Sequence, residues 1–153
     1  PLLAQVYNTH ADGYGFDFYA ALAANGATQV PSPGEVVAGV AEGRFAAGMT
    51  LEFSARAALD KGSPVAIARP DPGAIGIYSP IAVVAGGSER PARDFVEWAL
   101  GLEAQEAIAA TGWRPVREDV AWDRSGGLVV PDWDQVFDRR TELLDTYVVV
   151  FNG

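Results

Sequence analysis

Residues 32–50 read SPGEVVAGVAEGRFAAGMT, and this stretch carries the strongest local signals for the fold. Ser32 is a favoured helix N-cap, Pro33 suits the first helical position, and Glu35 stands where a capping box needs a carboxylate. Beyond the glycine that ends this helix, the short apolar run 45–49 is typical of a buried strand. The stretch therefore predicts a helix followed by a strand, the alternation of an α/β fold.

The same alternation continues toward the carboxyl end. Thr50 is expected to cap a second helix, which Lys61-Gly62 ends. One face of this helix carries Leu51, Ala55, Ala58 and Leu59. Residues 64–69 and 75–85 are rich in Val and Ile and bounded by Pro and Gly, so both predict strands, the second one bent at Ser79-Pro80.

Helices dominate the rest of the chain. Pro91 is expected to open one helix, and residues 103–111 form another. The apolar face of the first consists of Phe95, Trp98, Ala99 and Leu102. Residues 113–130 show little periodicity and predict a connector, after which Asp132 starts a last element. Its helical stripe consists of Trp133, Phe137, Arg140, Leu144, Tyr147 and Phe151, although the β-branched run 148–150 also suits a strand.

Toward the amino end, an apolar run over residues 2–7 allows a short strand. Asp12 suits the N-cap of a helix that Asn25-Gly26 ends. Its expected core face consists of Phe16, Tyr19, Ala20 and Ala23. The chain starts at Pro1 without an export segment, so we expect its natural start to lie upstream.

Composition narrows the range of functions. The 153 residues are 49% hydrophobic, which is enough for a folded core, and contain no cysteine for disulfides or thiolate metal sites. The net charge of -9 disfavours nucleic acid as a partner. No apolar run reaches the roughly 20 residues of a membrane span.

Catalytic motifs are absent from the sequence, which contains no nucleophile elbow, zinc-protease motif, phosphate-binding loop or calcium loop. The single histidine, His10, would need a serine and a carboxylate brought to it by folding, and nothing in the spacing of His10, Asp12 and Glu52 requires a metal. We therefore expect no enzyme, metal or cofactor. Trp98 and Trp133 lie on helix stripes and predict core positions; the remaining tryptophans, Trp113 and Trp122, are open between core and ligand stacking.

Several segments, in order, resemble the second lobe of the extracytoplasmic solute-binding proteins of ABC importers, the ferric-iron type in particular. They are GEVVAGVAEG (34–43), FAAGMT (45–50), AALDKGSPV (57–65), GAIGIYSPIAV (73–83), PARDFVEW (91–98) and EAQE (103–106), and the likeness ends at Pro131-Asp132-Trp133. The resemblance implies an α/β fold of the type II periplasmic-binding class, represented by the second lobe plus the return segment, with the N-terminal lobe largely missing.

This resemblance implies a division into three segments. Residues 1–79 would form the second-lobe core, 80–118 the hinge return with first-lobe helices, and 119–153 a connector and C-terminal helix that packs back on the second lobe. The implied partners are a small-molecule or ion ligand, the transporter permease and the N-terminal lobe. A homodimer through the exposed interlobe surface is a further expectation, and the implied location is extracytoplasmic, periplasmic or anchored at the cell surface.

The resemblance also suggests where a ligand binds. Helix starts offer unpaired N–H groups and a partial positive charge, and the candidate contacts lie at two such starts and on the hinge strand. They are Asp12, Gly13, Tyr14, Gly15, Thr50, Glu52, Phe53, Tyr78 and Ser79. Glu52 argues against a bare anion at the second start.

One departure from the family pattern bears on the ligand. Ferric members place two adjacent tyrosines where this chain has Phe53-Ser54. Phenyl and hydroxymethyl groups are poor iron ligands, so the sequence argues against reading the chain as an iron carrier and makes small organic solutes or oxyanions at least equal candidates. An effector-binding domain of a transcription regulator, which shares the two-lobed fold, is the alternative interpretation, and a small enzyme built around His10 is a third.

Overall fold

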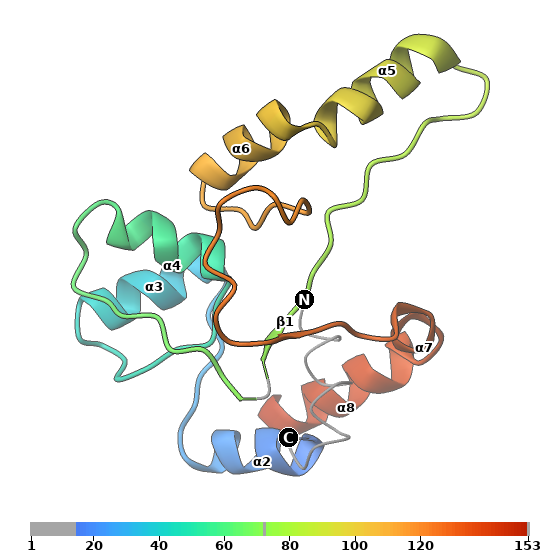
Figure 1. Ribbon diagram of the computed structural model, residues 1–153. Helices are drawn as coiled ribbons and strands as arrows, with labels where there is room; N and C mark the ends of the chain where they lie inside the picture. Colours follow the sequence, from blue (N-terminus) through green and yellow to red (C-terminus); the bar gives the residue numbers. More distant parts are fainter. Residues whose placement is uncertain (1–14, 72, 153) are drawn as a thin grey trace. The chain divides into compact units, whose positions relative to one another are not determined.

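The computed structural model describes residues 15–71 and 73–152 (Figure 1). These residues are mostly helical and carry one small parallel sheet of two strands, so the expected alternation of helices and strands is present only in part. The helices are α2 (Phe16–Ala24), α3 (Pro33–Ala41), α4 (Glu52–Leu59), α5 (Glu89–Ala99), α6 (Leu102–Ala110), α7 (Trp133–Asp138) and α8 (Arg140–Asn152), and the strands are β1 (Ala74–Ile75) and β2 (Leu128–Val129).

The chain divides into two compact units. The described residues of the first unit are 15–29, 69–71, 73–78 and 126–152, which contain α2, the sheet, α7 and α8. The second unit comprises residues 30–68 and 79–125, with helices α3 to α6.

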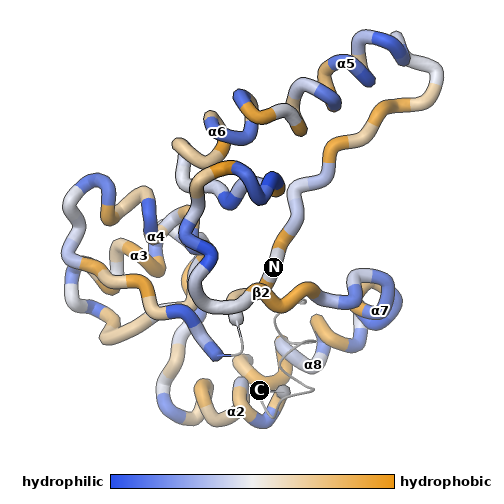
Figure 2. The backbone as a smooth tube through the Cα atoms, viewed as in Figure 1, coloured by the Kyte–Doolittle hydropathy of each residue, from blue (hydrophilic) through white to orange (hydrophobic). Residues whose placement is uncertain are grey.

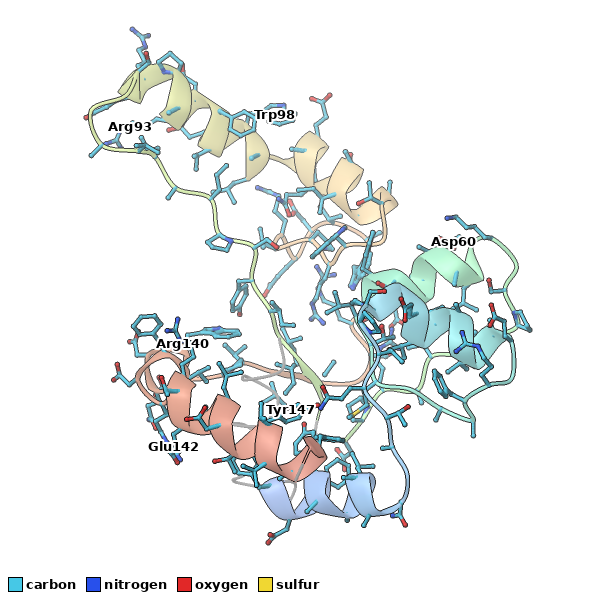
Figure 3. All side chains as sticks on the ribbon, turned by 180° about the vertical axis from the view of Figure 1, so that it is seen from behind. Asp60, Arg93, Trp98, Arg140, Glu142 and Tyr147 are labelled. Atoms are coloured by element: carbon cyan, nitrogen blue, oxygen red, sulfur yellow. The ribbon has the colours of Figure 1, made fainter. Side chains whose placement is uncertain are left out.

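The core of the first unit is aromatic and joins α2 to α8. Tyr19 is 1% exposed, Leu143 2% and Tyr147 8%, and the two tyrosine rings meet edge to face with centroids 5.9 Å apart. The partly buried residues around them are Phe16, Phe18, Leu22, Val150 and Phe151. Burial raises the pKa of the Tyr147 hydroxyl. Figure 3 shows Tyr147 on α8.

The C-terminal end of α2 agrees with the prediction, whereas the predicted N-cap residue is not among those described. Asn25 is the C-cap and Gly26 adopts a φ of +80°, a conformation that glycine reaches without steric cost, so the predicted Asn25-Gly26 stop is confirmed. Gly15 occupies the N-cap position. Asp12, predicted for that role, lies outside the described residues.

The two-stranded sheet depends on glycine. Ala74 pairs with Leu128 and Ile75 with Val129 in parallel register, and the amide of Ala74 donates to the Gly127 carbonyl at 3.0 Å. A Cβ added to Gly73 would lie 2.5 Å from the Gly127 carbonyl group. Only glycine therefore permits the backbones to approach this closely.

The carboxyl end is helical, and the predicted stripe is only partly correct. Asp132 caps α7 by accepting a hydrogen bond from the Gln135 amide at 3.1 Å, and α8 continues through 148–150, so the alternative of a terminal strand is wrong. Phe137 is 72% exposed, whereas Val136 is 4% exposed. Apolar side chains lie on more than one face of α7, and the periodicity of the sequence does not decide which face packs against the rest of the protein.

In the second unit, α3 begins at the predicted residues, although only the Ser32 half of the predicted capping box is formed. Ser32 is its N-cap, and its Oγ accepts a hydrogen bond from the Glu35 amide at 3.2 Å, with Pro33 at the first helical position. Val37 and Gly39 are buried on this helix. The sequence signal is confirmed because a cap is made by residues adjacent in the chain.

Three predicted strands are wrong over most of their length. Residues 45–49 and 64–69 form no strand, and of 75–85 only Ile75 belongs to one. Met49 is 53% exposed, so the first run is not buried either. A strand needs a neighbouring strand that takes up its backbone N–H and C=O groups, and among the described residues the only such pairing joins Ala74–Ile75 to Leu128–Val129.

Helix α6 forms where predicted, whereas α5 begins at Glu89, two residues before Pro91, and the core assignment on α5 is wrong. Phe95 is 56% and Trp98 55% exposed, with their rings packed on each other at a centroid distance of 5.6 Å. Figure 3 shows Trp98 projecting from α5, and both hydrophobic and hydrophilic residues line this helix in Figure 2. Trp133, the other predicted core tryptophan, is 37% exposed.

Candidate functional site

Helix α4 presents one of its faces to α3. The groove between the two helices encloses about 260 Å³. Its lining consists mostly of small side chains, namely Gly34, Val37, Ala38, Ala41, Ser54, Ala57, Ala58, Lys61 and Ser63. This face of α4 is therefore committed to helix packing.

The start of α4 differs from the prediction. Leu51, not Thr50, is the N-cap, and no side chain caps the helix. Thr50 instead donates its hydroxyl hydrogen to the Pro33 carbonyl at 3.0 Å, which ties the approach to α4 to the first residue of α3. The cap prediction was wrong because an available acceptor on a distant residue engaged the threonine hydroxyl.

The other face of α4 carries a cluster of charged and aromatic side chains, which we call the Arg56 cluster: Glu52, Phe53, Arg56, Trp113 and Trp122. Arg56 donates through Nε and Nη2 to Glu52 Oε1, at 2.8 and 2.6 Å. Its guanidinium carbon lies 4.6 Å from the centre of the Trp122 ring, within cation–π range. The Phe53 and Trp113 rings pack with centroids 4.9 Å apart and planes at 31°.

Burial differs across the Arg56 cluster. The side chains of Arg56 and Glu52 are 26% and 30% exposed, whereas Trp113 is 42% exposed. Trp122 Nε1 is buried without a hydrogen-bond partner in the described part of the chain. An unsatisfied buried donor is uncommon and is one of the features that mark a site for attention.

The loop after α6 holds both tryptophans against α4. Gln105, 5% exposed, donates from Nε2 to the Ala99 carbonyl at 2.7 Å and accepts from the Val116 amide at 2.9 Å. Gly112 has a φ of +88°, and a Cβ added to it would lie 3.6 Å from Phe53 and 3.8 Å from the Arg56 Cβ. These contacts place residues 112–113 directly beside the first turns of α4.

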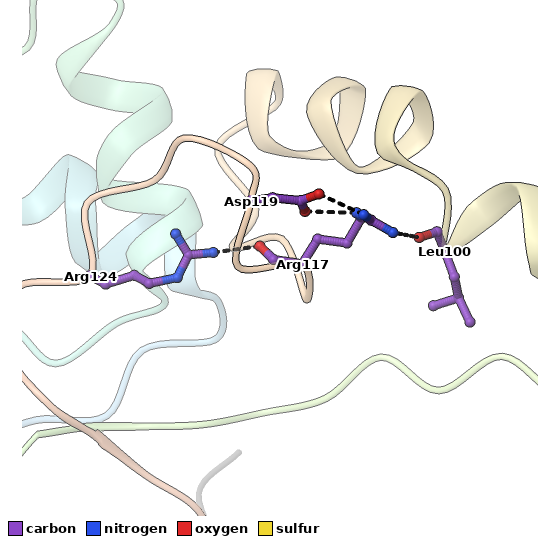
Figure 4. Close-up of polar contacts among 4 residues, drawn as sticks. All are labelled: Leu100, Arg117, Asp119 and Arg124. Atoms are coloured by element: carbon purple, nitrogen blue, oxygen red, sulfur yellow. Dashed lines mark hydrogen bonds and ion pairs between the residues drawn. The ribbon is translucent and has the colours of Figure 1, made fainter.

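Two arginines close the loop that carries Trp122 (Figure 4). Arg117 binds Asp119 through both carboxylate oxygens, at 2.8 and 2.6 Å, and donates to the Leu100 carbonyl at 3.4 Å. Arg124 donates to the Arg117 carbonyl at 2.7 Å and to the Val120 carbonyl at 3.1 Å. The hydrogen bond from Arg117 lowers the pKa of Asp119, and the same bond raises the pKa of Arg117.

The other predicted ligand contacts are distributed over both units. Gly15, in the first unit, is a buried N-cap, and Tyr78, at the edge of the same unit, is 54% exposed. Ser79 is exposed and belongs to the second unit, together with Thr50, Glu52 and Phe53. Asp12, Gly13 and Tyr14 lie outside the described residues.

Sequence reasoning missed Arg56 and left the roles of Trp113 and Trp122 open. The spacing of Glu52 and Arg56 by four residues is a readable signal for a helical ion pair. The tryptophans carry no such signal, because Trp113 lies 60 and Trp122 66 positions beyond the α4 residues they meet, Phe53 and Arg56.

No group of three or more His, Asp or Glu side chains gathers within the described ranges as a metal site would require. Among the described helices, none is both long and apolar enough to cross a membrane.

Comparison with known proteins identifies one family. Residues 3–114 match the family model described as "Bacterial extracellular solute-binding protein". No curated protein matches the chain, and no solved structure does. The family is non-enzymatic, in agreement with the expectation from the sequence, and the mostly helical fold with its small parallel sheet is consistent with a fragment of a solute-binding protein. The chain therefore belongs to the bacterial extracellular solute-binding protein family.

Proposed function

We propose that this chain is a ligand-capturing lobe of an extracytoplasmic solute-binding protein that delivers a small solute to an ABC importer. The observation that carries the proposal is the family match over residues 3–114, which includes Glu52, Phe53, Arg56 and Trp113. Solute-binding proteins of two lobes capture a ligand by hinge closure, and a lobe contributes one wall of the cleft.

The proposed ligand contacts are the residues that the resemblance indicated: Asp12, Gly13, Tyr14, Gly15, Thr50, Glu52, Phe53, Tyr78 and Ser79. The Arg56 cluster supports the choice of Glu52 and Phe53, because polar and aromatic groups converge beside them on a supported surface. The division into segments 1–79, 80–118 and 119–153 belongs to the same proposal.

The proposed solute is a small organic molecule or an oxyanion and not ferric iron. Phe53-Ser54 stands at the positions of the ferric tyrosine pair, and Ser54 lines the groove toward α3. The proposed partners are the importer's permease and the complementary N-terminal lobe, with a homodimer as the alternative occupant of the interlobe surface. The family description supports a location outside the cytoplasm.

A thermal-shift screen of the whole chain tests this function. The panel contains ferric citrate, phosphate, a phosphonate, spermidine, glucose and L-phenylalanine, each at matched ionic strength. A ligand at one hundred times its Kd stabilises the folded state by about 2.7 kcal/mol, which corresponds to a rise in Tm of roughly 5 °C or more. A rise with at least one solute class is expected; unchanged melting with every solute contradicts the proposal, and a rise with ferric citrate alone contradicts the iron argument.

A further inference from the structure

The Glu52–Arg56 ion pair is a neutral pair of opposite charges beside an aromatic surface. Arg56 uses Nε and Nη2 for Glu52, and its Nη1 has no hydrogen-bond partner among the residues the structure describes. Both side chains are about a quarter to a third exposed, at 26% and 30%. Both side chains are therefore in contact with solvent.

The aromatic surface begins at the next residue. Phe53 follows Glu52 in the chain and packs against Trp113, which remains 42% exposed. Gly112 lies close to both Phe53 and Arg56, so Trp113 is held on the side of α4 that carries the ion pair. A ring laid on the exposed part of Trp113 would gain apolar contact and stacking on the same side of α4 as the ion pair.

Charge balance selects the class of solute. An anion near this pair gains from Arg56 but is opposed by Glu52, in a chain whose net charge is -9. A lone cation gains from Glu52 and is opposed by Arg56. A zwitterion places a negative group at the guanidinium and a positive group at the carboxylate, so that both interactions are favourable.

We propose that the Arg56 cluster binds a free amino acid with an aromatic side chain. Its carboxylate accepts a hydrogen bond from Arg56 Nη1, its ammonium group donates to Glu52, and its ring packs on Trp113. This assignment rests on the proposed function and specifies the solute class at the same site.

Calorimetric titration of the whole chain with four probes tests the assignment. L-Phenylalanine carries both charges and the ring, 3-phenylpropanoate lacks the ammonium group, phenethylamine lacks the carboxylate, and glycine lacks the ring. We expect L-phenylalanine to bind roughly tenfold or more tightly than each of the other three, because each has lost a charged hydrogen bond or the aromatic contact. Equal affinities for L-phenylalanine and 3-phenylpropanoate, or no binding of L-phenylalanine, overturn it.

Charge variants provide a readout that misfolding cannot imitate. Glu52→Gln leaves Arg56 without its counter-charge, so the affinity for L-phenylalanine falls and that for 3-phenylpropanoate rises. The matched control is Glu142→Gln on α8, which removes an exposed ion pair between Glu142 Oε1 and Arg139 Nη2, 2.6 Å apart. Trp113→Ala should abolish the preference for L-phenylalanine over glycine, whereas Trp98→Ala on α5 should preserve it.

The outcomes separate this inference from the proposed function. A thermal shift with phosphate, spermidine or glucose and none with L-phenylalanine overturns the amino-acid assignment and leaves the solute-binding function supported. Binding of L-phenylalanine with unchanged selectivity in Glu52→Gln overturns the assignment to the Arg56 cluster. Absence of any response to any solute contradicts both.

Discussion

The guanidinium carbon of Arg56 lies 4.6 Å from the centre of the Trp122 ring, so a single arginine connects α4 with the loop that follows α6. The same side chain forms a part-buried ion pair with Glu52. Together with the packing of Phe53 on Trp113, Arg56 therefore joins helix α4 to a loop some sixty residues later in the chain.

Replacing this arginine should destabilise the second unit. Arg56→Ala removes a part-buried cation–π contact and the ion pair with Glu52, and we expect the free energy of unfolding to fall by about 1–2 kcal/mol. The control is Arg93→Ala on the exposed surface of α5 (Figure 3), which should change it by no more than about 0.5 kcal/mol. Urea unfolding measures both; losses of the same size in the two variants would show that Arg56 has no special role.

Leu143 and its neighbour Leu144 give a matched test of the core between α2 and α8. Leu143 is 2% exposed beside Tyr19 and Tyr147, whereas Leu144 is 40% exposed. Leu143→Ala should lower the free energy of unfolding by about 2–5 kcal/mol, because it opens a cavity in packed surroundings. Leu144→Ala should cost much less, and a larger loss for Leu144→Ala would mean that the opposite face of α8 is the buried one.

Two serines at N-cap positions differ in one hydrogen bond. Ser32 accepts from the Glu35 amide at 3.2 Å, whereas Ser88 precedes α5 without a side-chain capping bond. We expect Ser32→Ala to lower the free energy of unfolding by about 1 kcal/mol and Ser88→Ala to leave it almost unchanged. Chemical denaturation followed by circular dichroism compares them, and indistinguishable midpoints would refute the capping assignment.

The ion pair of Asp119 with Arg117 predicts a specific pH dependence. The pKa of Asp119 is lowered in the folded protein, so its stabilising effect is fully present above the pKa of the unfolded chain and is lost as the pH falls through the folded value. Asp119→Asn should therefore reduce the Tm at neutral pH and have a smaller effect in acid. Asp94→Asn on α5, where the described residues offer no ion-pair partner, is the control, and parallel pH–Tm curves for the wild type and Asp119→Asn exclude the linkage.

The sequence predicted best what neighbouring residues decide. The Ser32 cap, the Asn25-Gly26 stop and the position of α6 each depend on contacts within a few residues, and all three are confirmed. Helix α5 also forms, but it begins two residues before Pro91. The strands over 45–49 and 64–69 were predicted from composition alone. Pairing, which composition does not contain, decides whether such a run becomes a strand.

The candidate site was predictable to a similar degree. Glu52 and Phe53 were identified as candidates because they lie at a predicted helix start in a segment that resembles the family. The aromatic residues that pack beside them, Trp113 and Trp122, lie about sixty positions further along the chain. Helical periodicity predicted an apolar face on α5. It does not predict whether another element packs on that face, and Trp98 is more than half exposed. Side chains that meet through tertiary structure leave no local pattern.

Hydrogen exchange with and without a bound solute tests the central claim, that the chain captures a solute at the start of α4. The solute that raises the Tm most is added at saturation, and amide protection is compared along the chain by mass spectrometry. We expect slower exchange in peptides that cover residues 50–56 and 112–122, with unchanged exchange in α8. Protection confined to other segments, or none at all with the solute bound, would contradict it.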